Sequence, residues 1–308
     1  MLSKIIACTA LSFVLLTTYA CKKTENEDTK YFSLKFKFSN SQPRLDNNGQ
    51  SVGLAPGHAA QSPDFNKLSI HYIELVKDEY TQLGQGAIIY RAPEKNIVAN
   101  GFTTAIDFDL SVQKGQDEIV LRVPISAIQE GNYKYVRASV GYQNYTIKFN
   151  INQVPSIGDV SNQNMTISSW IGYNTYINSA VVRTKTLTVN GAKKQGFWAA
   201  ETDFLPQYAA YNSITSGQAS GTTVVNPLAS FGNPVPAGSC VITGASTTPI
   251  VIGRGVNAKE VAVTLSFSTN QSFEWIDSNN NGKWDITYPS NVEQVVDMGL
   301  RGMQVRTN

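Results

Sequence analysis

Alternation of apolar and polar residues is the feature of this sequence that most restricts its fold. The run from Tyr31 to Phe38 places an apolar side chain at every second position, and the run from Val261 to Ser268 does the same. A period of two is that of a β-strand with one buried face. No segment keeps a helical period over more than about two turns. The sequence therefore predicts an all-β fold, and we expect an antiparallel β-sandwich.

Further extended runs lie between and after these two. We expect strands at residues 68–76, 87–90, 105–110, 119–124, 133–150, 165–182, 185–189 and 295–305. The run at 133–150 is broken near Gly141, which indicates a hairpin or a bent strand that passes between two sheets. Asn190-Gly191 is a strong signal for a hairpin turn. We place a β-sandwich domain at 31–190 and a loop-rich β region at 191–308, with two packed β subdomains as the alternative to one.

Two long stretches are rich in glycine and proline, at residues 39–66 and 191–255. Such composition predicts long irregular connections rather than regular strands. The second stretch also contains many aromatic residues, which argue against a solvated linker. We expect it to form ordered loops with short strands that decorate one end of the sandwich.

The first 20 residues have the pattern of a removable export signal. Lys4 precedes an apolar run from Ile5 to Leu16. That run is about a dozen residues long and therefore shorter than the roughly 20 needed to span a bilayer. Ala20-Cys21 at its end is similar to a lipobox, in which the cysteine is acylated and becomes the first mature residue. An ordinary secretory signal is the alternative. Residues 21–30 are polar, and we expect them to form a tether.

The signal, Cys21 and the tether together resemble those of outer-membrane lipoproteins of Bacteroidota. The resemblance implies export from the cytoplasm, a membrane anchor through lipid on Cys21, and an outer-membrane location. The acidic residues of the tether favour display at the cell surface. Cys8 would leave with the signal, so Cys240 alone would remain and no intramolecular disulfide could form. We expect Cys240 to be a small buried residue.

The charge balance argues against a nucleic-acid partner. The chain carries a formal charge of +2, and loss of Lys4 with the signal lowers this by one, to +1. Basic residues are scattered, and Lys193-Lys194 is the densest basic pair after the tether. A nucleic-acid-binding protein would show a basic patch or stripe instead.

A polar loop near the end of the chain has the spacing of a calcium site. Oxygen ligands fall on alternate positions of this loop: Asp277, Asn279, Asn281, the carbonyl of Lys283, and Asp285. Gly282 stands where the chain must turn sharply. The loop resembles those of EF-hand and dockerin proteins, and the resemblance implies a bound calcium ion with a structural role.

The closing acid of such a loop is missing at its usual place. Position 12 of the loop holds Tyr288, where a bidentate carboxylate is expected. Glu293 is the first candidate to complete the shell, and Glu274 and Asp297 are the others. Asparagine at two positions lowers the charge and predicts a weak site of the extracellular kind. An Asx-rich turn without metal is the alternative.

Two similar pentads give the best signal for a ligand surface. They are Gly141-Tyr-Gln-Asn-Tyr145 and Gly172-Tyr-Asn-Thr-Tyr176. Exposed aromatic rings beside amides suit a glycan or a peptide. Cross-strand packing of the aromatics is the alternative. Residues three apart on a strand face opposite sides, so each pentad should bury one tyrosine unless its glycine introduces a bulge. The candidate ligand residues are Tyr142, Tyr145, Trp170, Tyr173, Tyr176 and Trp198.

The sequence contains no recognised catalytic motif, and we assign no catalytic residue. Only His58 and His71 are available, too few for a histidine-based metal cluster. The strand expected at 68–76 has a faint similarity to the methanobactin-associated copper-binding lipoproteins. Two histidines are too few to predict a copper site from it. Asp107 and Asp109 should lie on the wet face of a strand. Glu201 and Asp203 are the carboxylate pair that a hydrolase could use.

Three functions remain open from the sequence. The first is a lipid-anchored, non-enzymatic β-sandwich that binds an extracellular glycan or peptide and is stabilised by calcium. The second is a structural or accessory lipoprotein, with residues 191–255 as the contact surface for another envelope protein. The third and least favoured is a hydrolase whose site contains Glu201 and Asp203.

Overall fold

The computed structural model describes residues 29–219 and 239–307. Within these ranges the chain consists of β-strands, and its helical elements are three short 3₁₀ turns: η1 (Ile125–Ala127), η2 (Pro206–Tyr211) and η4 (Gly255–Asn257). The prediction of an all-β fold is confirmed. The expected signal, Cys21 and the tether up to residue 28 lie outside the described residues. No helix in the described part of the chain is long and apolar enough to cross a membrane.

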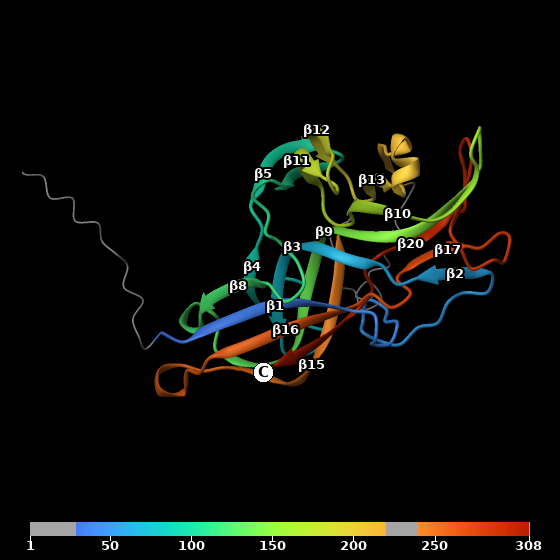
Figure 1. The fold of residues 1–308 in the computed structure, drawn as a ribbon. Coiled ribbons are helices and arrows are strands. Elements are labelled where there is room, and N and C mark those ends of the chain that lie inside the picture. Colours follow the sequence, from blue (N-terminus) through green and yellow to red (C-terminus); the bar gives the residue numbers. More distant parts are fainter. Residues whose placement is uncertain (1–28, 220–238, 308) are drawn as a thin grey trace, which may run out of the picture.

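One long strand, β9 (Gly131–Val154), organises the sheets (Figure 1). Its first half pairs with β15 (Cys240–Ile252), and its second half pairs with β10 (Gly158–Trp170). Its other edge pairs with β3 (Asp64–Val76) and then with β18 (Asp285–Thr287). β9 is thus one continuous strand rather than a hairpin, and both of its halves belong to the same large sheet instead of passing between two sheets.

The first half of β9 belongs to a curved sheet that surrounds the main core. From β15 the sheet continues through β21 (Met303–Thr307), β16 (Val261–Ser268) and β1 (Tyr31–Ser39) to β8 (Ile119–Pro124). On the other side of β9, β3 pairs with β4 (Ala87–Arg91) and β7 (Gln113–Lys114). Phe32, Leu34 and Phe36 fill the core, as their alternation predicted. The sheet is mixed rather than purely antiparallel, because β1 and β16 run side by side in parallel.

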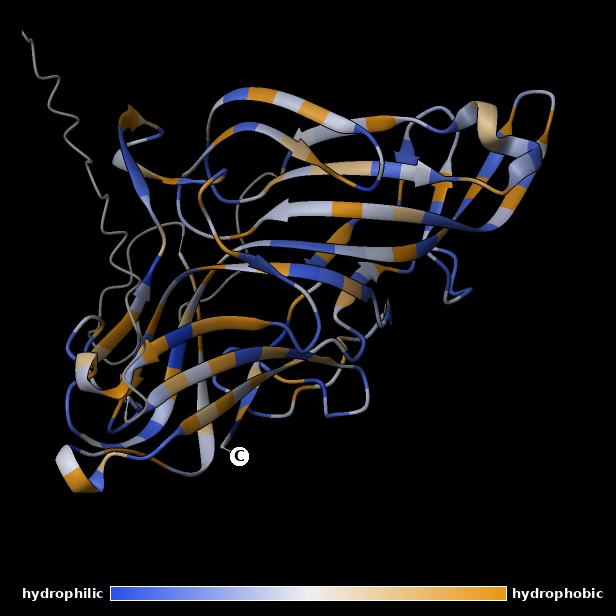
Figure 2. Ribbon diagram, turned by 60° about the vertical axis from the view of Figure 1, so that its left-hand side comes forward, coloured by the Kyte–Doolittle hydropathy of each residue, from blue (hydrophilic) through white to orange (hydrophobic). Residues whose placement is uncertain are grey.

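The second half of β9 is covered on both faces. It extends into a sheet through β10, β13 (Phe197–Asp203) and β14 (Ile214–Gln218). A three-stranded sheet packs on one face: β2 (His58–Gln61), β17 (Phe273–Ile276) and β20 (Val295–Met298). A four-stranded sheet packs on the other: β12 (Thr186–Lys193), β11 (Thr175–Val181), β6 (Phe102–Asp107) and β5 (Glu94–Ala99). Figure 2 shows apolar and polar residues alternating along these strands.

The expected boundary near residue 190 does not separate two sheets. β13, β15 and β16 come from the later part of the chain, yet they pair with β10, β9 and β1 from the earlier part. The stretch at 191–255 contributes β13, β14 and β15 to the same large sheet. Its residues 220–238 lie outside the described part, so this expected partner surface is only partly described.

The glycines of the two pentads bring the second half of β9 into contact with the turn after β10. The pairing of β3 with β9 shifts by one residue at Gly141, as a β-bulge does. The carbonyl oxygen of Gly141 accepts hydrogen bonds from the N–H groups of Ile171 at 3.1 Å and Gly172 at 3.4 Å. A Cβ atom on Gly172 would lie 1.9 Å from the carbonyl oxygen of Val140. Only glycine permits this approach of the two backbones.

A buried ion pair fixes the register of β3 against β9. Glu74 lies opposite Arg137, and both side chains are fully buried with their charged atoms 3.4 Å apart. Arg137 also donates to the carbonyl oxygens of Glu79 and Thr81, while Glu74 accepts from the N–H of Gly86. The pair therefore also holds the loop that connects β3 to β4. Loss of one partner would leave an uncompensated buried charge.

We predict that Gly172→Ala destabilises the protein by about 2–4 kcal/mol, because the added methyl group forces two backbones apart. The free energy of unfolding in urea measures the effect. Gly191→Ala is the matched control, since its nearest contact to an added Cβ is Val189 O at 3.8 Å. Equal stability of the two variants would contradict the close approach.

Candidate functional site

The loop with calcium spacing joins β17 to β18 and is fastened to the core at its end. Trp284 is buried and packs edge-on against Phe273, with ring centroids 5.1 Å apart. The indole Nε1 of Trp284 donates to the carbonyl oxygen of Glu293 at 3.1 Å. β18 then pairs with the end of β9. The polar loop therefore lies between β17 and β18, two strands that are fixed by packing and by strand pairing.

Asp277 starts the loop and shapes its turn. Its Oδ1 accepts the N–H of Asn281 at 3.1 Å, and its Oδ2 accepts the N–H of Gly282 at 2.8 Å. Gly282 has φ +69°, a left-handed conformation that glycine adopts without strain. The sharp turn expected at Gly282 is therefore present.

The two asparagines continue this pattern. Asn279 Oδ1 accepts the N–H of Asn281 at 3.1 Å, and Asn281 Oδ1 accepts the N–H of Lys283 at 2.7 Å. The side-chain oxygens at loop positions 1, 3 and 5 each accept a backbone N–H further along the loop. These Asx turns curl the backbone around its own polar side chains. The Lys283 side chain is exposed to solvent.

Asp285 is the point on which these side chains converge. Its Oδ2 accepts hydrogen bonds from Nδ2 of Asn279 and Nδ2 of Asn281, both at 2.7 Å. Its Oδ1 accepts from Nδ2 of Asn150 on β9 at 2.9 Å. Burial alone would raise the pKa of Asp285, but the amide hydrogen bonds outweigh it and lower the pKa below its usual value. Asp285 is therefore a carboxylate at neutral pH.

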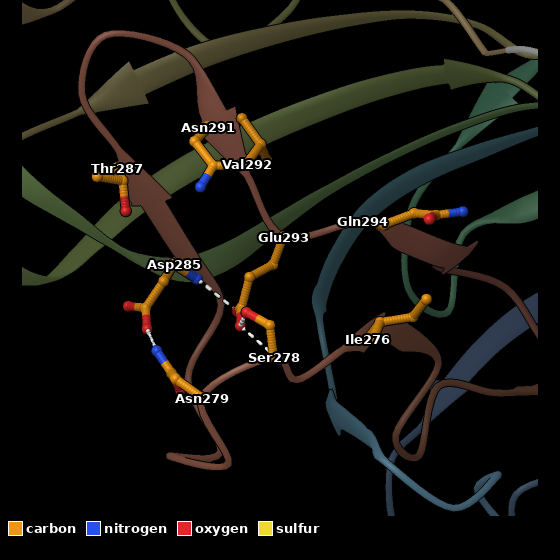
Figure 3. Close-up of a pocket in the computed structure, with 9 residues that line it drawn as sticks. All are labelled: Ile276, Ser278, Asn279, Asp285, Thr287, Asn291, Val292, Glu293 and Gln294. Carbon is orange, nitrogen blue, oxygen red and sulfur yellow. Dashed lines mark hydrogen bonds between the residues drawn. The ribbon is translucent and has the colours of Figure 1, made fainter.

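Glu293 is the acid that closes the loop. Its Oε1 accepts from the N–H and the hydroxyl of Ser278, both at 2.9 Å, and its Oε2 accepts from the N–H of Asp285 at 3.0 Å (Figure 3). One carboxylate thus links the start of the loop to its end. The other candidates are engaged elsewhere: Glu274 pairs with Arg44 and His58, and Asp297 pairs with Arg301.

The chemistry of this oxygen set suits a hard cation. Carboxylate, amide and backbone oxygens are the ligands that calcium takes in proteins. In the present arrangement the amide nitrogens of Asn279 and Asn281 face Asp285, so a cation there would replace two hydrogen bonds. Among residues 29–219 and 239–307, no three His, Cys, Asp or Glu side chains form a group able to hold a metal. Calcium at this loop therefore stays a prediction.

A pocket of about 310 Å³ opens beside the loop (Figure 3). Its walls are hydroxyl, amide, carboxylate and small apolar groups: Ser278, Thr287, Asn279, Asn291, Gln294, Asp285, Glu293, Ile276 and Val292. No lysine or arginine lines it. The sequence did not reveal this pocket, because a third of its lining residues come from β19 (Asn291–Val292) and Gln294, beyond the loop motif.

Three of the six candidate ligand residues are core residues. Tyr142, Tyr145 and Trp170 are fully buried, so the prediction that they form a ligand surface is wrong. Tyr142 packs with Trp170 beneath the four-stranded sheet, while Tyr145 packs toward Phe273 beneath the three-stranded sheet. The two tyrosines face opposite sides, as their spacing predicted, but both sides are covered.

The other three aromatics are partly exposed and do not form one surface. Lys95 Nζ lies over the ring of Tyr176 at 4.6 Å from the centroid. Trp198 packs against Gly217, where an added Cβ would lie 2.7 Å from the indole. Tyr173 stacks on His71 with ring centroids 4.9 Å apart. Each of these rings already has a partner within the fold.

His71 belongs to a polar cluster that the sequence did not predict. Its Nε2 lies 2.7 Å from Glu94 Oε1, and the Tyr173 hydroxyl lies 2.9 Å from Thr104 Oγ1. Desolvation by burial lowers the pKa of His71, so the ring is neutral at pH 7. The pairing of β3 shifts at His71, and such a bulge re-aims a side chain without a clear sequence signal. The cluster ties β3 to the four-stranded sheet.

The two carboxylate pairs have structural partners. Asp107 is buried and lies 3.2 Å from Lys95 Nζ on the neighbouring strand β5, so its expected place on a wet face is wrong. Asp109 is exposed and accepts a hydrogen bond from Asn178. Asp203 pairs with Arg183 at 2.9 Å.

Glu201 caps the turn between β11 and β12. Its carboxylate accepts the N–H groups of Arg183, Thr184 and Lys185, each at 2.9 Å, and the hydroxyl of Thr184 at 2.5 Å. Burial would raise the pKa of Glu201, but these hydrogen bonds lower it overall. A buried carboxylate with four donors is engaged in holding the turn rather than presented to a substrate.

Comparisons of the chain with models of protein families, with curated proteins and with solved structures found no match. The functional argument therefore depends on the residues and their geometry.

We predict that calcium raises the melting temperature by about 2–4 °C when present at roughly ten times a millimolar Kd, which corresponds to about 1.4 kcal/mol. Thermal unfolding with calcium and with chelator measures the shift. Asp277→Asn should lose most of it, because the loop loses a charged ligand. Asp46→Asn is the control, since Asp46 caps a turn in the same way away from the loop. If the wild type melts at the same temperature with calcium and with chelator, the loop is a turn that binds no metal.

We predict that Glu201→Gln lowers the free energy of unfolding by about 1–3 kcal/mol at pH 7, because all four donors of the turn lose a charged acceptor. A lowered folded-state pKa means that the ionised form stabilises the fold above the unfolded pKa near 4.5. The difference between wild type and variant should therefore shrink as the pH falls below 4.5. Urea unfolding at several pH values tests this, and a difference independent of pH would contradict it.

Proposed function

We propose that this protein is a lipid-anchored protein of the cell envelope that binds an extracellular glycan. The binding site is the pocket beside the loop from Asp277 to Asp285, and calcium fixes the loop. The observation that carries the proposal is the chemistry of the pocket, whose walls combine hydroxyls, amides and carboxylates with two small apolar side chains. Hydrogen-bonding groups around an apolar patch suit the polar edges and apolar faces of a sugar ring.

The charge of the pocket favours a neutral glycan over a peptide. Asp277, Asp285 and Glu293 together carry three negative charges, one more than a bound calcium ion would balance, and no basic side chain lines the pocket. A peptide carboxylate or a phosphate group would therefore meet repulsion. Asn291 and Gln294 are exposed amides at the rim, and they can donate to and accept from sugar hydroxyls.

The anchor is supported by the residues around Cys21, and the remaining thiol of the mature chain has no part in it. Cys240 is buried as expected, and burial raises its pKa to about 12. The thiol is therefore an inert core group rather than a disulfide partner. An exported domain without disulfides needs other sources of stability, and a calcium-fixed loop is one of them.

We predict that Asn291→Ala combined with Gln294→Ala weakens glycan binding by about tenfold or more, since each lost hydrogen bond contributes about 1 kcal/mol. A glycan array identifies the ligand, and calorimetry with and without calcium measures its affinity. Asn96→Ala, on an exposed position of β5, is the matched control. A peptide library screened in parallel tests the other ligand class, and selective peptide binding or binding to neither library would overturn the proposal.

A further inference from the structure

The end of the domain where β1 begins carries an exposed apolar turn. This turn is η4, between β15 and β16, and the side chain of its Val256 is 100 % exposed. Val251 at the end of β15 is also exposed, at 57 %. Lys259 follows the turn and Lys30 precedes β1, and both side chains are exposed. We call Val251, Val256, Lys259 and Lys30 the anchor-side surface.

The turn that presents Val256 is held rigidly. Arg254 donates through Nη1 to the carbonyl oxygen of Ile125 at 2.9 Å and through Nη2 to that of Ile128. A Cβ on Gly253 would lie 2.5 Å from the carbonyl oxygen of Asn257, which shows how tightly the turn closes. Val256 therefore projects from a fixed support rather than from a loose loop.

The turn also adjoins the place where the chain enters the fold. The backbone N–H of Tyr31 donates to Glu260 Oε1 at 3.0 Å, and Phe32 pairs with Val261. The start of β1 and the η4 turn lie at one end of the molecule, and β17 and β20 lie at the other (Figure 1). The anchor-side surface is thus at the opposite end from the pocket.

The length of the tether limits how far this end can be from a lipid on Cys21. Nine residues, 22–30, separate Cys21 from β1. Fully extended, nine residues span at most about 32 Å, so the anchor-side surface stays close to the bilayer. Attachment also raises the local concentration of the surface at the membrane, so weak contacts become effective.

We propose that the anchor-side surface rests on the anionic bilayer that holds the lipid of Cys21, an inference that depends on the proposed anchor. Val256 enters the headgroup region, and Lys259 and Lys30 face the anionic headgroups. The carboxylate of Glu260 accepts the N–H of Tyr31, and its charge leaves the pair Lys30 and Lys259 with a net charge of +1 on this surface. Apolar insertion combined with electrostatic attraction is the general mode of interfacial binding.

Site-directed spin labelling tests the contact on the full chain, expressed in a bacterium that acylates lipoproteins. The label is placed through Val256→Cys, or through Val98→Cys as the control, because Val98 is 89 % exposed on β5, away from this surface. Cys240 is buried and does not react. The protein is inserted into vesicles of phosphatidylethanolamine and phosphatidylglycerol. Mass spectrometry of the same sample establishes whether Cys21 carries lipid.

We expect the ratio of oxygen to nickel-chelate collisions to be roughly threefold higher at position 256 than at position 98, since a label in the interface meets oxygen and avoids water-soluble chelate. Vesicles of phosphatidylcholine alone should reduce this difference. An acylated protein with equal ratios at both positions overturns the contact but leaves the proposed anchor standing. A protein without lipid on Cys21 overturns the anchor and the contact together.

Discussion

The fold depends on the hydrogen bonding of β9 along both of its edges. The residues from Val136 to Tyr145 are buried without interruption, although polar side chains alternate with apolar ones among them. A polar group on a strand that is buried on both faces is costly when it has no partner, and its charged and amide groups above all need partners inside the protein. Arg137 therefore pairs with Glu74, and Asn144 donates to Ser168 and to the carbonyl oxygen of Val182. These contacts fix the register of β9 against β3 and β10.

This burial explains which parts of the fold the sequence could predict. The alternation of Phe32, Leu34 and Phe36 indicated a strand with one buried face, and that face does line the main core. The alternation around Tyr142 gives the same signal, but there the polar face is covered as well. Period-two patterns report that side chains alternate, and they do not report how many layers cover the strand. The pattern of the pentads therefore does not separate a ligand surface from core packing, and two of their four tyrosines, Tyr142 and Tyr145, are core residues.

The candidate site was predictable to the extent that it is local in sequence. The spacing of Asp277, Asn279, Asn281 and Asp285 is set by one short loop, so its turn at Gly282 follows from residue types alone, whereas the amide hydrogen bonds to Asp285 were not predicted. Partners that come from distant parts of the sequence cannot be predicted in this way. Asn150 on β9 donates to Asp285 although the two residues are 135 positions apart in the sequence, and no local pattern predicts such a contact. The same holds for His71 and Glu94, which meet only because β3 bulges.

β9 connects the end of the molecule that carries the η4 turn with the end that carries the loop. Gly131, where β9 begins, pairs with Ile252 beside the η4 turn, and its later residues Asn150 to Asn152 pair with β18 beside the loop. About 20 residues of strand at roughly 3.3 Å each separate these points along the chain, before any bend is counted. A membrane attached at the first end leaves the pocket at the second end facing outward. A single continuous strand thus places the proposed lipid anchor and the proposed glycan pocket where neither obstructs the other.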